Sequence, residues 1–176
     1  MAEKFIDALK EINCSFTLSL SPANGERVGV RGRKGFEFEM AGKIKVLLSK
    51  LGLDVHNRGL ITVANELRDA GMEVIYLGNS FPKEIINTAI QEDVDIVGIS
   101  SLGGAHLTLG GELMEEAKRE GLQQRMAFVI GGVFPPADAA KLQEIGFDKT
   151  FMPGATREEI VSSIHKIFSA KMDRSP

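Results

Sequence analysis

The residue types best suited to chemistry gather in one short stretch of the chain, Lys50–Gly59. Within it His56 follows Asp54 by two residues, a spacing at which the carboxylate can hydrogen-bond one ring nitrogen and orient the other. This is the arrangement of a metal-ligating histidine, because the aspartate makes the imidazole a stronger donor to a metal. Lys50 could in turn hold Asp54 ionised. A hydrogen-bonded or solvated surface pair is the alternative interpretation, and the spacing alone favours it.

A single histidine cannot hold a bare zinc ion, because zinc sites take three or four protein ligands. His106 and His165 occur in other parts of the chain, and Cys14 is the single cysteine. If His56 binds a metal, the other ligands must therefore come from a cofactor, which indicates a macrocycle such as a haem or a corrin. We assign no site role to the other two histidines: we expect His106 near a helix start and His165 on the surface of the last helix.

The elements that must position these residues follow a regular alternation. From Lys43 onward, short apolar runs alternate with amphipathic runs of helical period, which predicts an α/β fold with a doubly wound, flavodoxin-like five-stranded parallel sheet in strand order 2-1-3-4-5. The expected strands are Ile44–Ser49, Glu73–Leu77, Ile96–Ser100, Ala127–Ile130 and Lys149–Met152. The expected helices are Gly59–Ala70, Pro82–Glu92, Leu107–Glu120, Pro136–Ile145 and Thr156–Phe168.

Ligands of such a sheet bind beyond the carboxyl ends of its strands, which selects the loops Lys50–Arg58, Ser100–His106 and Gly131–Pro135. The first loop has no GxGxxG turn for a dinucleotide, and the chain has no P-loop. Small or turn-forming residues after the later strands leave room for a large cofactor with a tail, although each also has an ordinary interpretation as a strand end or turn. They are Ser100, Leu102, Gly131, Gly132, Pro153 and Gly154.

Composition excludes other classes of protein. Lys and Arg total 21 against 24 Asp and Glu, so the chain lacks the basic excess that nucleic-acid binding requires. The sequence has no apolar stretch long enough for a signal peptide or a membrane span, and one cysteine gives no sign of an oxidising compartment. We therefore expect a cytoplasmic protein that binds neither nucleic acid nor membrane.

The chain divides into three parts by composition. Residues 1–42 form an N-terminal appendage, residues 43–170 the main domain, and residues 171–176 a disordered tail. Glu26–Lys45 carries six basic and three acidic residues, so it is either a solvated rim or a docking segment for a partner.

Three short motifs together resemble the cobalamin-binding domain family, whose pattern is Asp-x-His-x-x-Gly, then Ser-x-Leu, then Gly-Gly. In this chain they read Lys50-x3-Asp54-x-His56-x2-Gly59, Ser100-x-Leu102 and Gly131-Gly132. The segments Val97–Leu109 and Ile130–Pro136 look like acyl-CoA mutases of the methylmalonyl-CoA mutase type, and the resemblance spans about Lys43–Phe168. The chain departs from the mutase pattern at three positions, with Val55 for Gly, Asn57 for Asp and Ala155 for Thr.

The resemblance implies base-off binding of adenosylcobalamin, in which His56 replaces the cofactor's own dimethylbenzimidazole as lower axial ligand of cobalt. Asp54 and Lys50 would then tune His56. In such enzymes the cofactor supplies a 5′-deoxyadenosyl radical, and the protein positions it. The implied cofactor-binding residues are Asp54, Val55, His56, Asn57, Arg58, Gly59, Ser100, Leu102, Gly131, Gly132, Phe151, Pro153 and Gly154.

The length of the chain bears on its function, because 176 residues do not hold both this domain and the roughly 250-residue (β/α)8 barrel in which such mutases bind acyl-CoA. The leading hypothesis is the small, cobalamin-carrying subunit of a two-chain acyl-CoA mutase, an isomerase whose large subunit binds the substrate. The alternatives are a corrinoid carrier of a methyltransferase system, a cobalamin-dependent sensor, or a domain of this fold without a cofactor.

Overall fold

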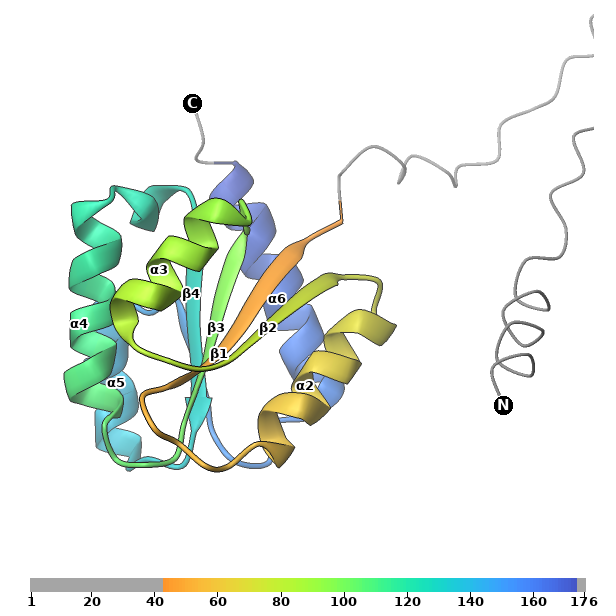
Figure 1. The fold of residues 1–176 in the computed structure, drawn as a ribbon. Coiled ribbons are helices and arrows are strands. Elements are labelled where there is room, and N and C mark those ends of the chain that lie inside the picture. The colour runs from red at the N-terminus through yellow and green to blue at the C-terminus, as the bar shows by residue number, and fades with distance from the viewer. Residues whose placement is uncertain (1–42, 174–176) are drawn as a thin grey trace, which may run out of the picture. The chain divides into compact units, whose positions relative to one another are not determined.

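The apolar runs of the sequence form one parallel five-stranded sheet in the computed structural model, which describes residues 43–173 (Figure 1). The strands are β1 (Lys45–Leu51), β2 (Glu73–Ser80), β3 (Ile96–Ser101), β4 (Ala127–Gly132) and β5 (Lys149–Phe151). Their order is β2-β1-β3-β4-β5, and every neighbouring pair is parallel. The predicted fold class and strand order are therefore confirmed.

The helices cover both faces of this sheet. They are α2 (Arg58–Asp69), α3 (Pro82–Gln91), α4 (His106–Arg119), α5 (Pro136–Glu144) and α6 (Arg157–Met172), with a short 3-10 turn at Leu122–Gln124. Proline begins α3 and α5, where its missing N–H has no intrahelical partner to lose. The Thr156 hydroxyl caps α6 by accepting the N–H of Glu159 at 3.2 Å.

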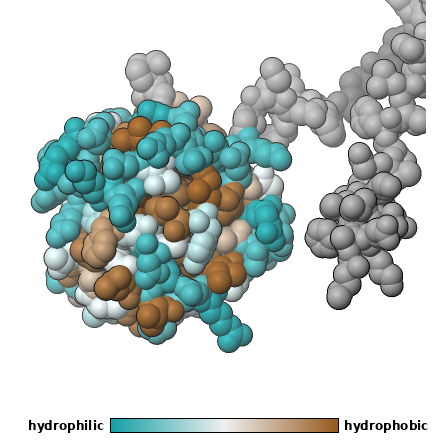
Figure 2. Space-filling model, in the orientation of Figure 1, coloured by the Kyte–Doolittle hydropathy of each residue, from teal (hydrophilic) through white to brown (hydrophobic). Residues whose placement is uncertain are grey.

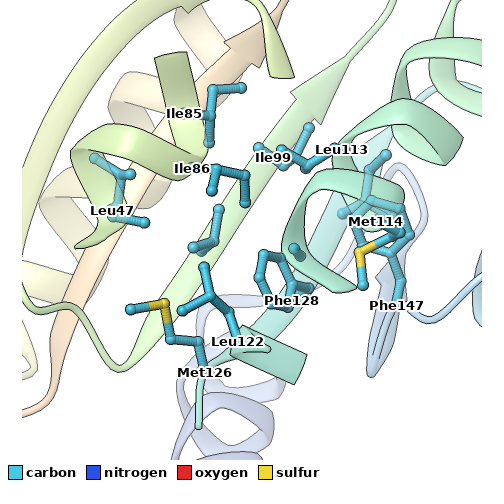
Figure 3. Packing of buried hydrophobic residues seen from close by; sticks show 14 of the residues in the cluster. Leu47, Ile85, Ile86, Ile99, Leu113, Met114, Leu122, Met126, Phe128 and Phe147 are labelled. Atoms are coloured by element: carbon cyan, nitrogen blue, oxygen red, sulfur yellow. The ribbon is translucent and has the colours of Figure 1, made fainter. Parts of the chain in front are cut away.

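Two apolar cores lie on opposite faces of the sheet, because successive side chains of a strand point to opposite sides. Leu47, Val97 and Phe128 pack under α3, α4 and α5, as Figure 3 shows in part. Val46 and Val129 belong to the other core, beneath α2 and α6. Strand β3 is buried along its whole length, which explains its uninterrupted apolar sequence.

Several element boundaries differ from the sequence-based expectation. Strand β1 extends two residues past Ser49 because it continues to pair with β2 beyond a bulge between Leu48 and Ser49. Lys50 therefore lies on a strand and not in the loop where we expected it. Helix α6 continues to Met172, so Lys171 and Met172 are helical and not part of the predicted tail.

The predicted docking segment at residues 1–42 lies outside the described residues, as do residues 174–176. None of the helices within residues 43–173 combines the length and apolar character needed to cross a membrane. The cytoplasmic location stays a prediction.

Candidate functional site

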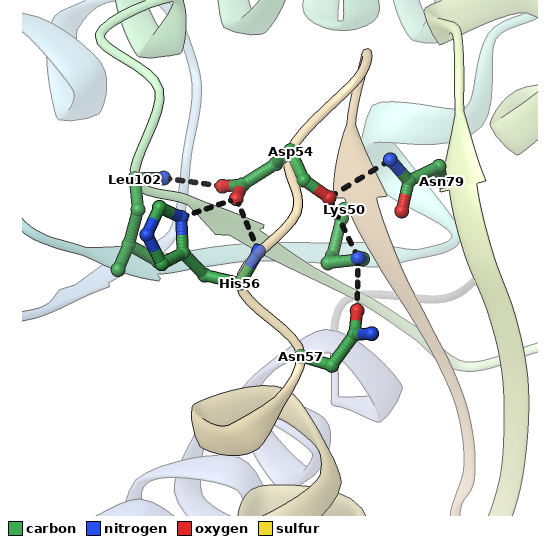
Figure 4. Close-up of polar contacts among 6 residues, drawn as sticks. All are labelled: Lys50, Asp54, His56, Asn57, Asn79 and Leu102. Carbon is green, nitrogen blue, oxygen red and sulfur yellow. Dashed lines mark hydrogen bonds and ion pairs between the residues drawn. The ribbon is translucent and has the colours of Figure 1, made fainter.

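Asp54 is the centre of a hydrogen-bond cluster at the carboxyl edge of the sheet (Figure 4). Its side chain is only 2% exposed. Oδ1 accepts the main-chain N–H of His56 at 2.8 Å and lies 2.9 Å from its ring Nδ1, while Oδ2 accepts the N–H of Leu102 at 2.7 Å. The loop after β1 is thus tied to the loop after β3, 48 residues further along the chain.

The surroundings of Asp54 keep its carboxylate ionised. Burial raises its pKa, but the hydrogen bonds from the main chain of His56 and Leu102 and from the His56 ring outweigh that effect and leave the pKa below its ordinary value. An ionised carboxylate only accepts hydrogen bonds, so Nδ1 of His56 carries a hydrogen and donates it.

His56 consequently presents its second ring nitrogen to solvent. The ring is 62% exposed, and in Figure 4 its far nitrogen points away from Asp54. In the neutral ring with its hydrogen on Nδ1, Nε2 holds an unshared electron pair. The arrangement can therefore donate to a metal ion through Nε2, with the ring orientation set by a buried anion.

Lys50 acts on the loop differently from our expectation. Its side chain is buried, and Nζ donates to the main-chain carbonyl of Asp54 at 2.7 Å and to Oδ1 of Asn57. The same carbonyl accepts from Nδ2 of Asn79 at 2.8 Å. Lys50 thus holds the main chain of the loop and does not pair with the Asp54 carboxylate. Its side chain projects from β1, and Nζ contacts the main-chain carbonyl of Asp54 instead.

Asn57 departs from the usual behaviour of an asparagine that precedes a helix. It stands at the N-cap of α2, but no side-chain cap is formed because its oxygen accepts from Lys50. The helix begins directly after the His56 loop with its first turn uncapped by a side chain. The Asn57 side chain thus holds the loop instead of capping the helix. A departure of this kind from local sequence preference is typical of a functional site.

A cavity of about 510 Å³ opens between the sheet, α2 and α6. Leu102 both lines this cavity and bonds Asp54, so the cavity lies beside the His56 loop. Nine of the residues that we predicted for the cofactor line it, namely Arg58, Gly59, Ser100, Leu102, Gly131, Gly132, Phe151, Pro153 and Gly154. Asp54, Val55, His56 and Asn57 do not line the cavity and form the adjoining loop.

Sequence reasoning did not assign several lining residues to the cofactor. Thr62, Val63 and Glu66 lie inside α2 and belong to no motif. Val133 and Met152 follow β4 and β5 beside the motif residues, and Ala155 entered the sequence analysis only as a departure from the family pattern. Asn79 was missed for another reason. Only the strand register, which places it opposite Lys50, brings it to the loop.

Glycine occurs at different positions around the cavity for different structural reasons. A side chain at Gly132 would place its Cβ 1.9 Å from the carbonyl oxygen of Ser101, so the neighbouring strand itself requires glycine there. At Gly59 and Gly154 a Cβ would meet no atom within 4 Å. Both line the cavity, so their missing side chains leave space for a ligand to approach the main chain closely.

Exposed apolar side chains occur on the His56 loop and elsewhere at this edge of the domain. Leu53 and Val55 are 83% and 80% exposed, and Leu102, Val133 and Met152 follow the adjacent strands. Figure 2 shows brown, apolar surface along the lower edge of the view, where the carboxyl ends of the strands lie in Figure 1. Val55 does not have a positive φ, so the valine that replaces the family glycine adopts an ordinary backbone conformation.

The described residues offer no protein-only metal centre. Within residues 43–173 no three His, Cys, Asp or Glu side chains come together in a way that could hold a metal ion. His165 lies exposed on α6, and His106 is the buried first residue of α4. A metal bound at His56 would take its other ligands from the bound group.

The model of the B12 binding domain matches residues 44–162 of the chain. The chain belongs to the B12-binding domain family. This confirms the resemblance predicted from the three motifs. The match covers the sheet, the His56 loop and all of the cavity-lining residues except Ile164.

Two curated relatives are similar over most of their own length. The 2-hydroxyisobutanoyl-CoA mutase small subunit of Aquincola tertiaricarbonis is 41% identical over 129 residues, which cover 73% of this chain and 94% of the relative. The pivalyl-CoA mutase small subunit of Xanthobacter autotrophicus is 44% identical over 123 residues, 69% of this chain and 81% of the relative.

A cobalamin-binding protein from Desulfitobacterium hafniense shares the fold. Its crystal structure superposes with a TM-score of 0.61 at 24% identity, over 69% of this chain and 57% of that one. At this identity the similarity concerns the fold alone.

Proposed function

We propose that this chain is the cobalamin-carrying small subunit of a two-chain, adenosylcobalamin-dependent acyl-CoA mutase. The observation that carries the proposal is the combination of an exposed imidazole, oriented by the buried Asp54, with a glycine-lined cavity beside it. The 41–44% identity to two mutase small subunits supports the mutase class over other users of cobalamin. The acyl-CoA site would then lie on a large partner subunit.

In this proposal Nε2 of His56 would bind the cobalt of the cofactor. Asp54 holds the imidazole in the required tautomer, and Lys50 and Asn79 hold the main chain of the loop. When bound, adenosylcobalamin supplies a 5′-deoxyadenosyl radical, so the chemistry of the rearrangement belongs to the cofactor. The task of these residues is to keep the ligand nitrogen in one place and one protonation state.

The cavity between α2 and α6 would hold the nucleotide tail of the cofactor. Gly59 and Gly154 allow it to pass close to the main chain, and Ser100 offers a hydroxyl near the end of β3. Phe151 at the end of β5 and Pro153 just after it line the cavity and add apolar surface. The sheet and the two helices would shield the tail from water on most sides.

The exposed apolar side chains near His56 have a role in the same proposal. The conjugated macrocycle of a corrin is broad and apolar inside its rim of amide side chains, and Leu53 and Val55 flank Asp54 on the loop that presents the ligand. Their exposure in the free chain would end when the ring covers them. Burial of such side chains contributes about 25 cal/mol per Å² of apolar surface removed from water.

A titration followed by ultraviolet–visible absorption tests the cofactor assignment. The purified chain should bind both adenosylcobalamin and hydroxocobalamin in the base-off form with an imidazole on cobalt. The H56A variant should bind base-off without the imidazole signature, whereas H165A, which removes an exposed histidine of α6, should behave like the wild type. If neither variant lost the imidazole signature, His56 would be excluded as the ligand.

The mutase assignment needs a second experiment. The chain, loaded with adenosylcobalamin, should form a complex with its large partner subunit, and the complex should isomerise a branched acyl-CoA. Methyl transfer in place of isomerisation would support the alternative, a corrinoid carrier of a methyltransferase system. A loaded chain that forms no complex and transfers no methyl group would favour a cobalamin-dependent sensor.

A further inference from the structure

A second histidine–aspartate pair lies at the same edge of the sheet and has no part in the site described above. His106 begins α4, and its Nε2 lies 3.0 Å from Oδ2 of Asp138 in the first turn of α5. The imidazole is buried, with 8% of the side chain exposed, and its ring centre lies 5.2 Å from that of Phe134. Asp138 also contacts Lys141 at 3.0 Å.

Packing by itself does not explain why a histidine occupies this place. Among the side chains within residues 43–173, His106 has a buried ring nitrogen, Nδ1, without a hydrogen-bond partner. A buried polar atom left unpaired lowers stability, and a phenylalanine would fill the same space against Phe134 without that cost. What the histidine adds is its hydrogen bond to Asp138, which ties the start of α4 to the start of α5.

The connection from β3 to α4 depends on anchors at its two ends. It consists of Leu102–Ala105, and a Cβ placed on Gly103 or Gly104 would meet no atom within 4 Å. Gly104 also has a φ of +78°, which glycine adopts readily. The middle of the loop is thus loosely surrounded. One end is held by the Leu102 N–H on Asp54 and the other by His106.

We propose that the His106–Asp138 pair is a positioning element for the cobalt ligand. It fixes the start of α4, and with it the short loop whose Leu102 N–H bonds the Asp54 carboxylate that orients His56. His106 and Asp138 do not line the cofactor cavity, so they act through the loop and touch no part of the bound group. The inference rests on the proposed function and adds two residues to the support of its ligand.

Three variants test the pair through the state of the bound cofactor. H106F keeps the aromatic packing on Phe134 and removes the hydrogen bond, and D138A removes its acceptor. D138N is the conservative variant, because its amide oxygen can still accept from Nε2. V94A is the matched control, since it truncates a buried apolar residue before β3, at the opposite edge of the sheet.

We expect H106F and D138A to weaken adenosylcobalamin binding about tenfold, the lower end of the range for loss of a residue that supports a metal ligand. Bound cob(II)alamin in these variants should also show, by electron paramagnetic resonance, a smaller fraction of cobalt split by an imidazole nitrogen. D138N should restore both readouts to within about twofold of the wild type. V94A should lower thermal stability and leave both readouts unchanged.

Wild-type affinity and an unchanged imidazole fraction in H106F and D138A would overturn the proposal. So would an equal loss of affinity in V94A, because the effect would then follow from stability alone. Failure of the proposed function looks different. In that case H56A would itself bind cobalamin as the wild type does, whatever the His106 variants show.

Discussion

The two histidine–aspartate pairs of this domain have nearly the same contact distance but differ in the burial of the histidine. In one, His56 is 62% exposed and Asp54 2%; in the other, His106 is 8% exposed and Asp138 16%. The nitrogen–oxygen distances are 2.9 and 3.0 Å. A histidine–aspartate hydrogen bond therefore does not identify a ligand site. The useful observation is whether the histidine is buried.

Burial of the aspartate leaves a ring nitrogen available to a ligand. Asp54 is held by main-chain N–H groups of two loops, so it serves as a fixed acceptor for an imidazole that faces solvent. Burial of the histidine has the reverse effect. Nε2 of His106 is used by Asp138, and Nδ1 is enclosed by the protein. The first pair is suited to binding and the second to holding two helices.

Replacement of each histidine by alanine gives the most direct test of this contrast. H56A should weaken adenosylcobalamin binding by about 100-fold or more, beyond the range for loss of a supporting residue, and change the free energy of unfolding by about 0.5 kcal/mol or less. H106A should destabilise the chain by about 1–3 kcal/mol, because it leaves a cavity and removes the hydrogen bond between α4 and Asp138. Cobalamin titration and urea unfolding of both variants check this. If both variants lost affinity and stability to the same extent, the two pairs would not differ in role.

The next largest effect concerns the buried carboxylate. D54N should weaken cobalamin binding about 10- to 100-fold, because an amide turns one of its two hydrogen-bonding atoms into a donor that faces the N–H of Leu102 or the His56 ring. D138N keeps its acceptor and is the matched control. Equilibrium titration of D54N and D138N with cobalamin checks which variant loses more affinity. Equal affinities would show that burial of Asp54 does not decide its effect on binding.

The cavity beside the exposed pair provides the third test. G59L places a side chain where no atom lies within 4 Å, so it should weaken binding of adenosylcobalamin about tenfold while cobinamide, which lacks the nucleotide tail, is unaffected. G111L makes the same change in α4, also in open space and away from the cavity. If G59L weakened both corrinoids equally, the tail would not occupy this cavity.

The smallest effect is the pH dependence of stability at the buried pair. Hydrogen bonds from His106 and Lys141 lower the pKa of Asp138 below its ordinary value of 3.8. The folded state therefore favours the ionised carboxylate, which stabilises the protein above that pH and stops doing so as the pH falls through the lowered pKa.

Urea unfolding from about pH 6 to about pH 3 checks the sign of this effect. The difference in unfolding free energy between the wild type and D138N should shrink with acidification. Asp54 contributes in the same range, but it is present in both proteins and cancels in the comparison. A constant difference would mean that the contacts of Asp138 do not favour its charged form.

Much of the fold followed from local patterns. Apolar runs such as Ile96–Ser100 are short and flanked by turn residues, and the runs between them have helical period, so strand order and class could be predicted. Boundaries were less predictable where pairing continues past the apolar run. Ser49–Leu51 is an example, because its hydrogen bonds to β2 depend on the tertiary structure.

The candidate site divides in the same way. His56 and Asp54 could be paired from the sequence because two residues separate them, and the later motifs pointed to residues that do line one cavity. The role of Lys50 was predicted wrongly in its detail, since which oxygen it reaches depends on the direction of β1 and the path of the loop. Asn79 carried no signal at all, because only the strand register brings it there.

The amino-acid sequence by itself determined the class of fold, the edge of the sheet that carries the site and the pairing of His56 with Asp54, because these depend on periodicity and on neighbours two residues apart. Only the tertiary structure decided which histidine faces solvent. That depends on contacts between residues 48 and 32 positions apart, from Leu102 to Asp54 and from Asp138 to His106. Burial is a property of packed elements, and no short segment of sequence contains it.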